Sequence, residues 1–326
     1  MKKCMLLLVA LLALVGCQSQ ESKENSDELT KVTVVLDWTP NTNHTGLYVA
    51  KEQGFFEKQG LDVDIIQPGE TGADQLVASG KAEFGISTQE SITQARVQEV
   101  PLVSIAAIIQ HNTSGFASPV DKNIKSPKDF EGKTYGGWGS PIEKAILSSL
   151  MKIENADSNK LDIINAGDAD FFTMVKKDVD FAWIYYAWTG VEAELRGEKI
   201  NMLYLTDYSE KLDNYTPVLA TNEKLIKSNP DTVKAFVKAA SQGYEFAIND
   251  SEKAADILLK AEPVLDEELV RKSQKWLASK YQDDAKQWGE QKVEVWEEYA
   301  NWMTEQEVLE GKFDAKKAFT NEFLPQ

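Results

Sequence analysis

The chain is poor in the residues that build covalent and metal chemistry. It has 326 residues but only two cysteines, Cys4 and Cys17, and two histidines, His44 and His111. Neither histidine has neighbouring carboxylates or cysteines at metal-ligand spacing. The sequence also lacks GxSxG, Walker and HExxH patterns. We therefore expect no metal, no cofactor and no disulfide.

Basic residues are also scarce, with 35 Lys and Arg against 52 Asp and Glu, a formal net charge of −17. Loss of Lys2 and Lys3, expected below, makes it −19. Such a surface repels nucleic acid and anionic membranes. We expect no nucleic-acid partner, and charge alone does not hold this chain at a membrane.

The sequence has no apolar run long enough to cross a bilayer. The longest, residues 5–15, follows Lys2 and Lys3 and is typical of a secretory signal. It ends in Leu14-Val15-Gly16-Cys17, which resembles the lipobox of bacterial lipoproteins, where the cysteine is diacylated. Residues 1–16 are then a signal peptide and Cys17, its thiol blocked, anchors the chain on the extracytoplasmic face of the cell membrane. An ordinary signal peptide with an incidental cysteine is the alternative.

A polar tether is expected over residues 17–30, which contain no aromatic residue. The remaining chain is long enough for two α/β lobes or one large lobe. Its Trp288, Trp296 and Trp302 lie near helical spacing among charged residues, which favours core packing over a ligand stripe.

Strand and helix patterns alternate along the body, which predicts parallel βαβ units. The first set has strands at 32–36, 61–67, 83–87 and 102–110, with helices at 45–53, 72–79 and 89–98. The second set has strands at 134–136, 161–166, 180–186 and 201–206, with helices at 141–151, 171–177 and 189–196. A brief apolar segment at 218–221 precedes about four long helices.

A polar cluster follows the first strand and precedes a helix. Ligands usually bind at such carboxyl ends of strands. The candidate residues are Asp37, Trp38, Asn41 and His44. A capped turn over a buried Trp38 is the equally weighted alternative.

The segment LDWTPNTNHTGLYVAKEQGFFEKQGLDV, residues 36–63, resembles the opening of thiamine-precursor-binding proteins of bacterial ABC importers. Their larger family includes the fungal pyrimidine synthase and the sulfonate- and nitrate-binding proteins. The GxFxxxGLxV part is shared across that superfamily, whereas DWTPNTNH and GGWGSPIE are narrower. Further similarity lies in GADQL (72–76), GIS (85–87), KDFEGK (128–133), GGWGSP (136–141) and WIYYAW (183–188).

The resemblance implies an α/β fold, a two-lobed periplasmic-binding-protein (type II) clamshell with two hinge segments. Lobe one would contain residues 31–113 plus 217–326, and lobe two residues 114–216. The crossings would lie near 112–117 and 214–220. Closure would couple ligand binding to a change of shape.

The resemblance also implies a small pyrimidine ligand, hydroxymethyl- or formylaminomethyl-pyrimidine. Trp38 from one lobe and Tyr185, Tyr186 and Trp188 from the other would stack on the ring, although one of the two tyrosines should lie in the core. Glu192 is the candidate carboxylate for the amino group, with a solvated helix residue as the alternative. Asn41 and His44 would add hydrogen bonds, whereas His111 near the hinge is expected to bond locally.

Two further loops are candidates. Backbone N–H groups of Gly137, Trp138 and Gly139 would hold a formyl oxygen, hydroxyl or phosphate, unless the loop is only a glycine-rich turn capped by Ser140. Ser87, Gln89 and Glu90 would face the cleft, unless Ser87 caps the following helix.

The function expected is therefore binding, not catalysis. The synthase depends on a Cys-rich motif that this chain lacks. Sulfonate or nitrate would need Arg or Lys at the strand ends, where the chain has Asp37, Glu90 and Glu192. Riboflavin stays open as a ligand. The partners expected are the permease and ATPase of one importer, and the protein is expected to be a monomer.

Overall fold

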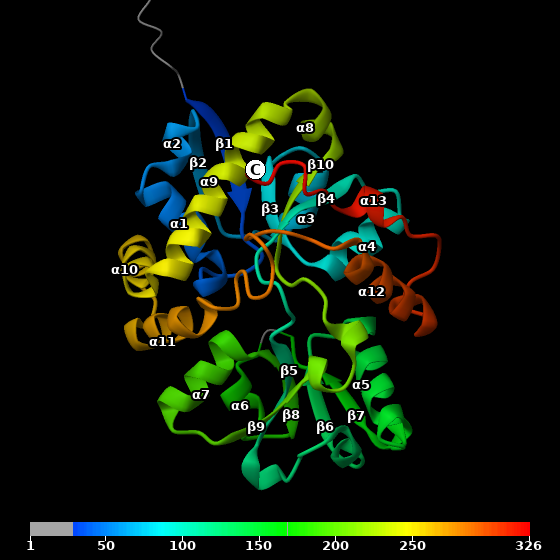
Figure 1. The fold of residues 1–326 in the computed structure, drawn as a ribbon. Coiled ribbons are helices and arrows are strands. Elements are labelled where there is room, and N and C mark those ends of the chain that lie inside the picture. The colour runs from blue at the N-terminus through cyan, green and yellow to red at the C-terminus, as the bar shows by residue number, and fades with distance from the viewer. Residues whose placement is uncertain (1–28, 168) are drawn as a thin grey trace, which may run out of the picture.

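The computed structural model describes residues 29–167 and 169–326. Two lobes, each built on a five-stranded sheet, lie one above the other in Figure 1. The expected signal peptide, Cys17 and nearly all of the expected tether lie outside the described residues.

The first sheet has the strand order β2-β1-β3-β10-β4. β1 is parallel to β2 and β3, while β10 runs antiparallel between β3 and β4. Its bounds are β1 Thr30–Val35, β2 Leu61–Ile66, β3 Phe84–Ser87, β4 Leu102–Ala107 and β10 Val218–Asn222.

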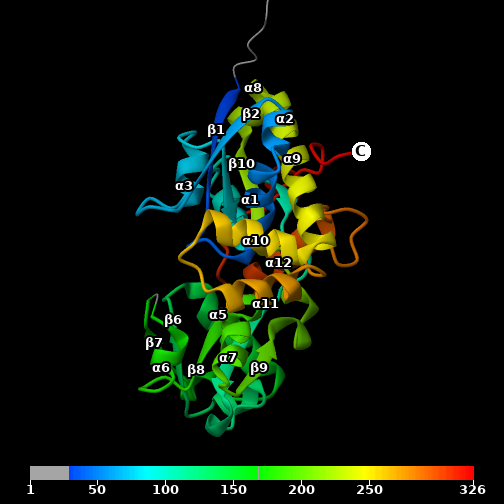
Figure 2. The same ribbon diagram turned by 90° about the vertical axis from the view of Figure 1, so that its left-hand side faces the viewer.

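Helices cover both faces of this sheet, as Figures 1 and 2 show. Successive strand residues point to opposite faces, so Val34 joins the core under α1 and α9, whereas Val35 joins the core under α3 and α4. The helices of this lobe are α1 Thr45–Glu52, α2 Phe55–Lys58, α3 Ala73–Ala78, α4 Gln89–Val97, α8 Glu223–Ser228, α9 Pro230–Asn249, α10 Ser251–Ala261, α11 Glu267–Leu277 and α13 Ala315–Ala318.

The second sheet repeats this plan in the order β7-β6-β8-β5-β9, with β5 antiparallel between β8 and β9. Phe116 and Phe181 pack on the α5 face, and Ala117 and Ala182 pack on the α6 and α7 face. The elements are β5 Ser114–Pro119, β6 Thr134–Gly137, α5 Pro141–Ile153, β7 Asp162–Asn165, α6 Phe171–Met174, β8 Phe181–Tyr185, a π-helical turn Tyr186–Gly190, α7 Val191–Arg196 and β9 Ile200–Tyr204.

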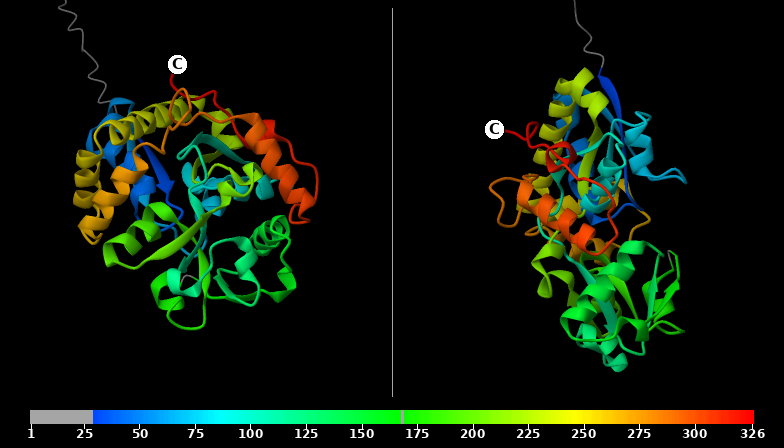
Figure 3. Two further views of the ribbon diagram at one scale, coloured as in Figure 1. Left: turned by 60° about the horizontal axis from the view of Figure 1, so that its bottom comes forward. Right: turned by 90° about the vertical axis from the view of Figure 1, so that its right-hand side faces the viewer.

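One C-terminal helix, α12 (Val293–Glu305), packs on both lobes. Trp296 lies in a core of the first lobe, and Trp302 and Met303 join the main core of the second. Figure 3 shows this helix, in orange-red, beside the junction of the lobes. Trp288, Trp296 and Trp302 are at most 2% exposed, which confirms that they are core residues.

The predicted two-lobed α/β fold is confirmed, and so are the predicted parallel βαβ units, because β1 is parallel to β2 and β3, and β6 is parallel to β7 and β8. Each sheet also contains an antiparallel strand that was not predicted, β10 in the first and β5 in the second. β5 occupies most of 112–117, where a crossing between the lobes was expected. The sequence of β5, SGFASP, has few β-formers, and it pairs because β8 and β9 supply both ladders. Gly115 suits this place since a Cβ there would overlap the Leu203 carbonyl.

Hydrogen bonds fasten the two crossing segments together. His111 Nδ1 lies 2.6 Å from Asp213 Oδ2, and the other oxygen of Asp213 accepts from the Asn112 N–H at 2.8 Å. His111 Nε2 lies 3.2 Å from Asp284 Oδ1 on the first lobe, and Lys292 lies 3.8 Å from Asp284. His111 thus bonds locally, as expected, and joins both crossings to the C-terminal region.

The N-terminus of α5 is capped by a buried carboxylate. Glu143 accepts hydrogen bonds from the Trp138, Gly139 and Ser140 N–H groups at 3.1, 2.7 and 2.7 Å, and from the Tyr135 hydroxyl at 2.5 Å. A Cβ on Gly137 would overlap this carboxylate, so a glycine is required there. One side chain therefore fixes the whole 137–140 turn.

His111 makes the stability of the fold depend on pH. Its bond to Asp213, partly opposed by burial, raises the pKa of His111 from 6.5 to about 9. The stabilisation is complete below pH 6.5 and is lost as the pH rises through about 9. We expect His111→Asn to lower Tm most at pH 6 and least at pH 9.5, measured by circular dichroism. Lys125→Asn, at an exposed site, should keep the wild-type slope, and an unchanged slope in His111→Asn would contradict the prediction.

Removal of the Glu143 carboxylate leaves a buried hydroxyl and three N–H groups without their acceptor. We expect Glu143→Ala to lower the free energy of unfolding by about 3 kcal/mol or more. Urea denaturation followed by fluorescence measures this change. The exposed Lys144→Ala on the same helix should stay within about 0.5 kcal/mol. Similar midpoints for the two variants would show that the cap is dispensable.

Candidate functional site

A cavity of about 260 Å³ lies between the two lobes, and we call it the first compartment. It is lined by Asp37, Trp38, Asn41, Asn43, Thr88, Trp183, Ile184, Tyr185, Trp188, Thr189, Thr216 and Pro217. Because β1 and β3 are parallel neighbours, the residues that follow them, Asp37 and Thr88, meet at one edge of the sheet. The end of β8 brings Tyr185 to face them from the second lobe.

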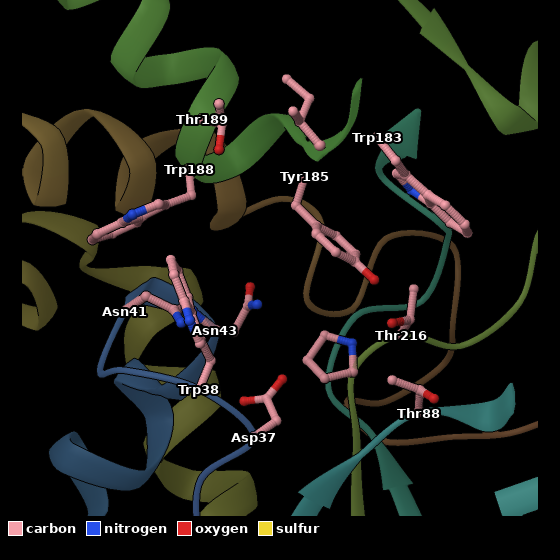
Figure 4. A pocket seen from close by; sticks show the side chains of 12 residues that line it. Asp37, Trp38, Asn41, Asn43, Thr88, Trp183, Tyr185, Trp188, Thr189 and Thr216 are labelled. Atoms are coloured by element: carbon pink, nitrogen blue, oxygen red, sulfur yellow. The ribbon is translucent and has the colours of Figure 1, made fainter. Parts of the chain in front are cut away.

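Aromatic rings from both lobes enter this compartment. Trp38 and Tyr185 are 51% and 38% exposed, unusually high for such large side chains. In Figure 4, Trp38 lies beside Trp188 on one side of the compartment, and Tyr185 and Trp183 lie across from them. Although much of the side chain is exposed, desolvation by the surrounding protein raises the pKa of Tyr185 to about 12, so its hydroxyl is neutral near pH 7. The compartment can hold a flat ring between aromatic faces.

Asp37 supplies the carboxylate of the first compartment, and His44 holds it from behind. His44 Nδ1 accepts the Asn41 N–H at 3.2 Å, so the ring hydrogen is assigned to Nε2, which donates to Asp37 Oδ1 at 2.7 Å. The His44 side chain is fully buried, whereas that of Asp37 is 32% exposed. The expectation that His44 itself bonds the ligand is therefore wrong, because Asp37 stands between them.

Asn41 reaches the compartment, but its side chain shapes the loop. Its Oδ1 accepts from the Asn43 N–H at 2.9 Å, and its Nδ2 donates to the Thr39 carbonyl at 2.9 Å. The equal alternative of a turn over a buried Trp38 is half right: the turn is capped, but Trp38 is exposed.

A second compartment of about 330 Å³ adjoins the first. Trp38, Trp183, Ile184, Trp188 and Thr189 line both. The second is completed by Gly136, Gly137, Trp138, Gly167, Ala169, Asp170, Phe171, Met174, Ala182 and Glu192. Glu192 thus lies at the cleft, but in the compartment away from Asp37, where Arg196 Nε donates to its Oε1 at 2.9 Å.

The glycine-rich turn does not offer the donors predicted for it. Glu143 already accepts the N–H groups of Trp138 and Gly139. Gly137 and Trp138 line the second compartment through their other atoms, and Gly139 lines neither compartment. The alternative of a capped turn is the one found, with Ser140 at the N-cap.

Tyr186 points away from both compartments. Its hydroxyl bonds Glu194, and its ring lies 5.3 Å from Trp276 of α11. The expectation that one of the two adjacent tyrosines lies in the core is wrong, because Tyr185 is exposed and Tyr186, the first residue of the π-helical turn, is only half-buried.

Ser87, Gln89 and Glu90 line neither compartment, and their contact with a ligand stays a prediction. Gln89 is fully buried and bonds the Tyr215 N–H and the Val295 carbonyl at 2.9 and 3.0 Å. Ser87 is 4% exposed and does not cap the helix, because Thr88 is the N-cap of α4.

Glu90 is a half-buried carboxyl in the first turn of α4. Burial raises the pKa of Glu90 to about 7, and the charge of Glu143 adds to the effect. Tyr299 of α12 donates to Glu90 at 3.5 Å. Burial also raises the pKa of Asp74, helped by Asp37 and opposed by hydrogen bonds from Ser87 and Ser91. These carboxyls favour their neutral form more than exposed ones do.

Several lining residues were not predicted. Trp183 had a usable signal, because it lies two residues before Tyr185 and therefore on the same face of β8. Asn43 and Thr88 lie beside predicted residues at the two strand ends. Thr216 and Pro217 belong to the second crossing segment, and only the folded chain brings them to the cleft.

The cleft is acidic. Within residues 29–167 and 169–326, no Lys or Arg lines either compartment. In that same part of the chain, no cluster of three or more metal-type ligands occurs. Nor do the described helices include one with the length and apolarity to cross a membrane.

Comparison with known proteins finds relatives that include binding proteins and a synthase. A formylaminopyrimidine-binding protein of Halalkalibacterium halodurans is 30% identical over 98% of both chains. A riboflavin-binding protein of Chloroflexus aurantiacus is 25% identical over 91% of this chain and 87% of that protein. A 4-amino-5-hydroxymethyl-2-methylpyrimidine phosphate synthase of Legionella pneumophila is 21% identical over 91% and 93%, respectively.

Solved structures share the fold at low identity. The ligand-binding component of an ABC-type import system from Staphylococcus aureus matches with a TM-score of 0.69 and 14% identity, over 90% of this chain and 97% of that one. The periplasmic aliphatic sulphonate-binding protein of Escherichia coli matches with a TM-score of 0.67 and 14% identity, over 88% and 91%. The predicted periplasmic-binding-protein fold is confirmed.

The family profile described as NMT1/THI5 like matches residues 41–254, which include nine of the ten strands in the described part of the chain and every residue there that lines the two compartments except Asp37 and Trp38. Together with the formylaminopyrimidine-binding relative, this match shows that the chain belongs to the NMT1/THI5-like family.

Proposed function

We propose that the protein is the extracytoplasmic solute-binding component of an ABC importer for a thiamine-type pyrimidine, hydroxymethyl- or formylaminomethyl-pyrimidine. The observation that carries the proposal is the first compartment, where aromatic faces and one supported carboxylate meet without any lysine or arginine lining the described cleft. A 4-aminopyrimidine has the complementary groups: a flat π face and an exocyclic amine that donates hydrogen bonds.

In this proposal Asp37 takes the role first expected of Glu192. Asp37 shares its compartment with Trp38 and Tyr185, whereas Glu192 lines only the second compartment. The amino group would donate to Asp37, and the ring would lie between Trp38 and Tyr185. His44 donates a hydrogen bond to Oδ1 of Asp37. This bond fixes the orientation of the carboxylate, and so the direction in which its other oxygen accepts a hydrogen bond from the ligand.

Closure would occur about the two crossing segments, with residues 31–113 plus 217–326 moving against 114–216. Trp38 and Tyr185 come from opposite sides of that division, so a ring between them joins the two lobes. The permease would sense the closed form, and its ATPase would drive release.

Binding without conversion is supported by the state of His44. This imidazole is buried and engaged at both nitrogens, by Asn41 and Asp37, so it has no contact with a bound ligand. The synthases among the relatives are less similar to this chain than the formylaminopyrimidine-binding protein is.

Two rival ligand classes differ in how well they fit. Sulfonate and nitrate lack donors for Asp37 and would face an acidic cleft without a lining cation. Riboflavin is favoured by one observation, the aromatic compartments, and a relative carries the name riboflavin-binding protein. Riboflavin is therefore the second candidate.

We also propose that the mature chain is a monomer, held by lipid on Cys17 at the extracytoplasmic face of the cell membrane. The support is the Leu-Val-Gly-Cys sequence after the apolar run and the charge of −17, which gives no attraction to anionic lipid.

Calorimetric titration of the purified protein tests the ligand. We expect saturable binding of hydroxymethyl- or formylaminomethyl-pyrimidine, and none of taurine. Trp38→Ala should weaken binding about tenfold or more through lost stacking, and Asp37→Asn about tenfold through loss of the charged acceptor. Asp62→Asn, an exposed residue of β2, removes the same charge and should leave affinity unchanged. Binding of riboflavin alone would transfer the assignment to the second candidate, and binding of taurine alone would overturn both.

Lipidation is tested in cells that produce the full chain. We expect the wild type to incorporate radiolabelled palmitate and to sediment with membranes, because Cys17 is the acylated residue. Cys17→Ser should lose the label and be found in the soluble extracytoplasmic fraction, while Cys4→Ser should behave as the wild type. Equal labelling of wild type and Cys17→Ser would refute the anchor.

A further inference from the structure

Indole rings dominate the second compartment. Trp38, Trp138, Trp183 and Trp188 all line it. Trp138 is 44% exposed, and its ring lies 5.1 Å from that of Trp183. Exposed aromatic surface of this kind forms cages for organic cations, because the negative face of each ring attracts positive charge.

The charges of the second compartment have the matching sign. Asp170 and Glu192 line it, and no Lys or Arg among the described residues does so. Both contacts from Arg196 go to Oε1 of Glu192. Oε2 has no hydrogen-bond partner within residues 29–167 and 169–326, so half of this carboxylate remains available to a ligand.

The arrangement of the two compartments limits what such a cation would be. They share Trp38, Trp183 and Trp188 as a common wall, so a group bound in one lies directly beside a group bound in the other. A pyrimidine ring in the first compartment, with a second ring on a short linker, would place that second ring against the shared indoles.

We propose that the second compartment is a subsite for a heteroaromatic cation joined to the pyrimidine through one carbon, the pyrimidinylmethyl-azolium class of ligand. The inference rests on the proposed function, since the first compartment must hold the pyrimidine. The four indoles bind the cationic ring, and Glu192 and Asp170 balance its charge. The cleft then accepts the two-ring compound as well as its pyrimidine fragment.

The test compares three probes by calorimetry on the purified protein: hydroxymethyl-pyrimidine, thiamine, and deazathiamine, in which a neutral ring replaces the thiazolium. We expect thiamine to bind about tenfold more tightly than deazathiamine, as one cation–π contact in a partly desolvated cage provides. Glu192→Gln and Trp138→Ala should each reduce the ratio of thiamine affinity to hydroxymethyl-pyrimidine affinity by about 3- to 10-fold.

Glu194→Gln is the matched control. Glu194 lies on the same helix, α7, and bonds Tyr186 and Lys272 outside both compartments. The Glu194→Gln substitution removes the same charge as Glu192→Gln. The ratio of thiamine affinity to hydroxymethyl-pyrimidine affinity should stay at the wild-type value.

The outcomes separate this inference from the proposed function. If hydroxymethyl-pyrimidine binds but thiamine binds no better than deazathiamine, or if Glu192→Gln and Glu194→Gln change the ratio equally, the subsite is overturned and the pyrimidine assignment stands. If none of the pyrimidine compounds binds, the proposed function itself fails.

Discussion

The structure depends on the way each sheet obtains its fourth strand. β5 follows the first crossing and enters the second sheet antiparallel, and β10 follows the second crossing and enters the first sheet in the same manner. Both strands are held on two sides, so neither crossing can move without the sheet to which it leads. This insertion brings Thr216 and Pro217 to the cleft and sets His111 beside Asp213.

The site also depends on hydrogen bonds between residues that support one another. The Asn41 N–H fixes the His44 tautomer, His44 directs one oxygen of Asp37, and the other oxygen is left for the cleft. Supporting hydrogen bonds of this kind hold the carboxylate in the orientation that the ligand requires. Without them the side chain would be free to rotate and would lose rotamer entropy on binding. His44 is therefore as much a part of recognition as the residues that touch the cavity.

Sequence reasoning succeeded where local pattern decides structure and failed where long-range partners decide it. The strand end before Asp37 and the aromatic run at Tyr185 were found from alternation and from the polar cluster, and the tryptophans of α12 from helical spacing. β5 was missed because its pairing comes from β8 and β9, not from its own residues. The free donors expected at Gly139 were lost to Glu143, four positions ahead, although an S-x-x-E capping pattern was present in the sequence. Gln89 follows a strand as ligand residues do, yet it is buried and bonds α12 and the second crossing.

Closure and selectivity are linked by the charge of the cleft. If the lobes closed without ligand, the exposed face of Asp37 would be buried without a donor, at a cost of about 1–3 kcal/mol or more. The exposed surfaces of Trp38 and Tyr185 would gain from burial, but two rings from opposite lobes need something flat between them to fill the space. A ligand that donates to Asp37 removes the penalty and supplies that surface, whereas an anion raises the penalty. The same side chains that recognise the ligand therefore decide whether the closed form is populated.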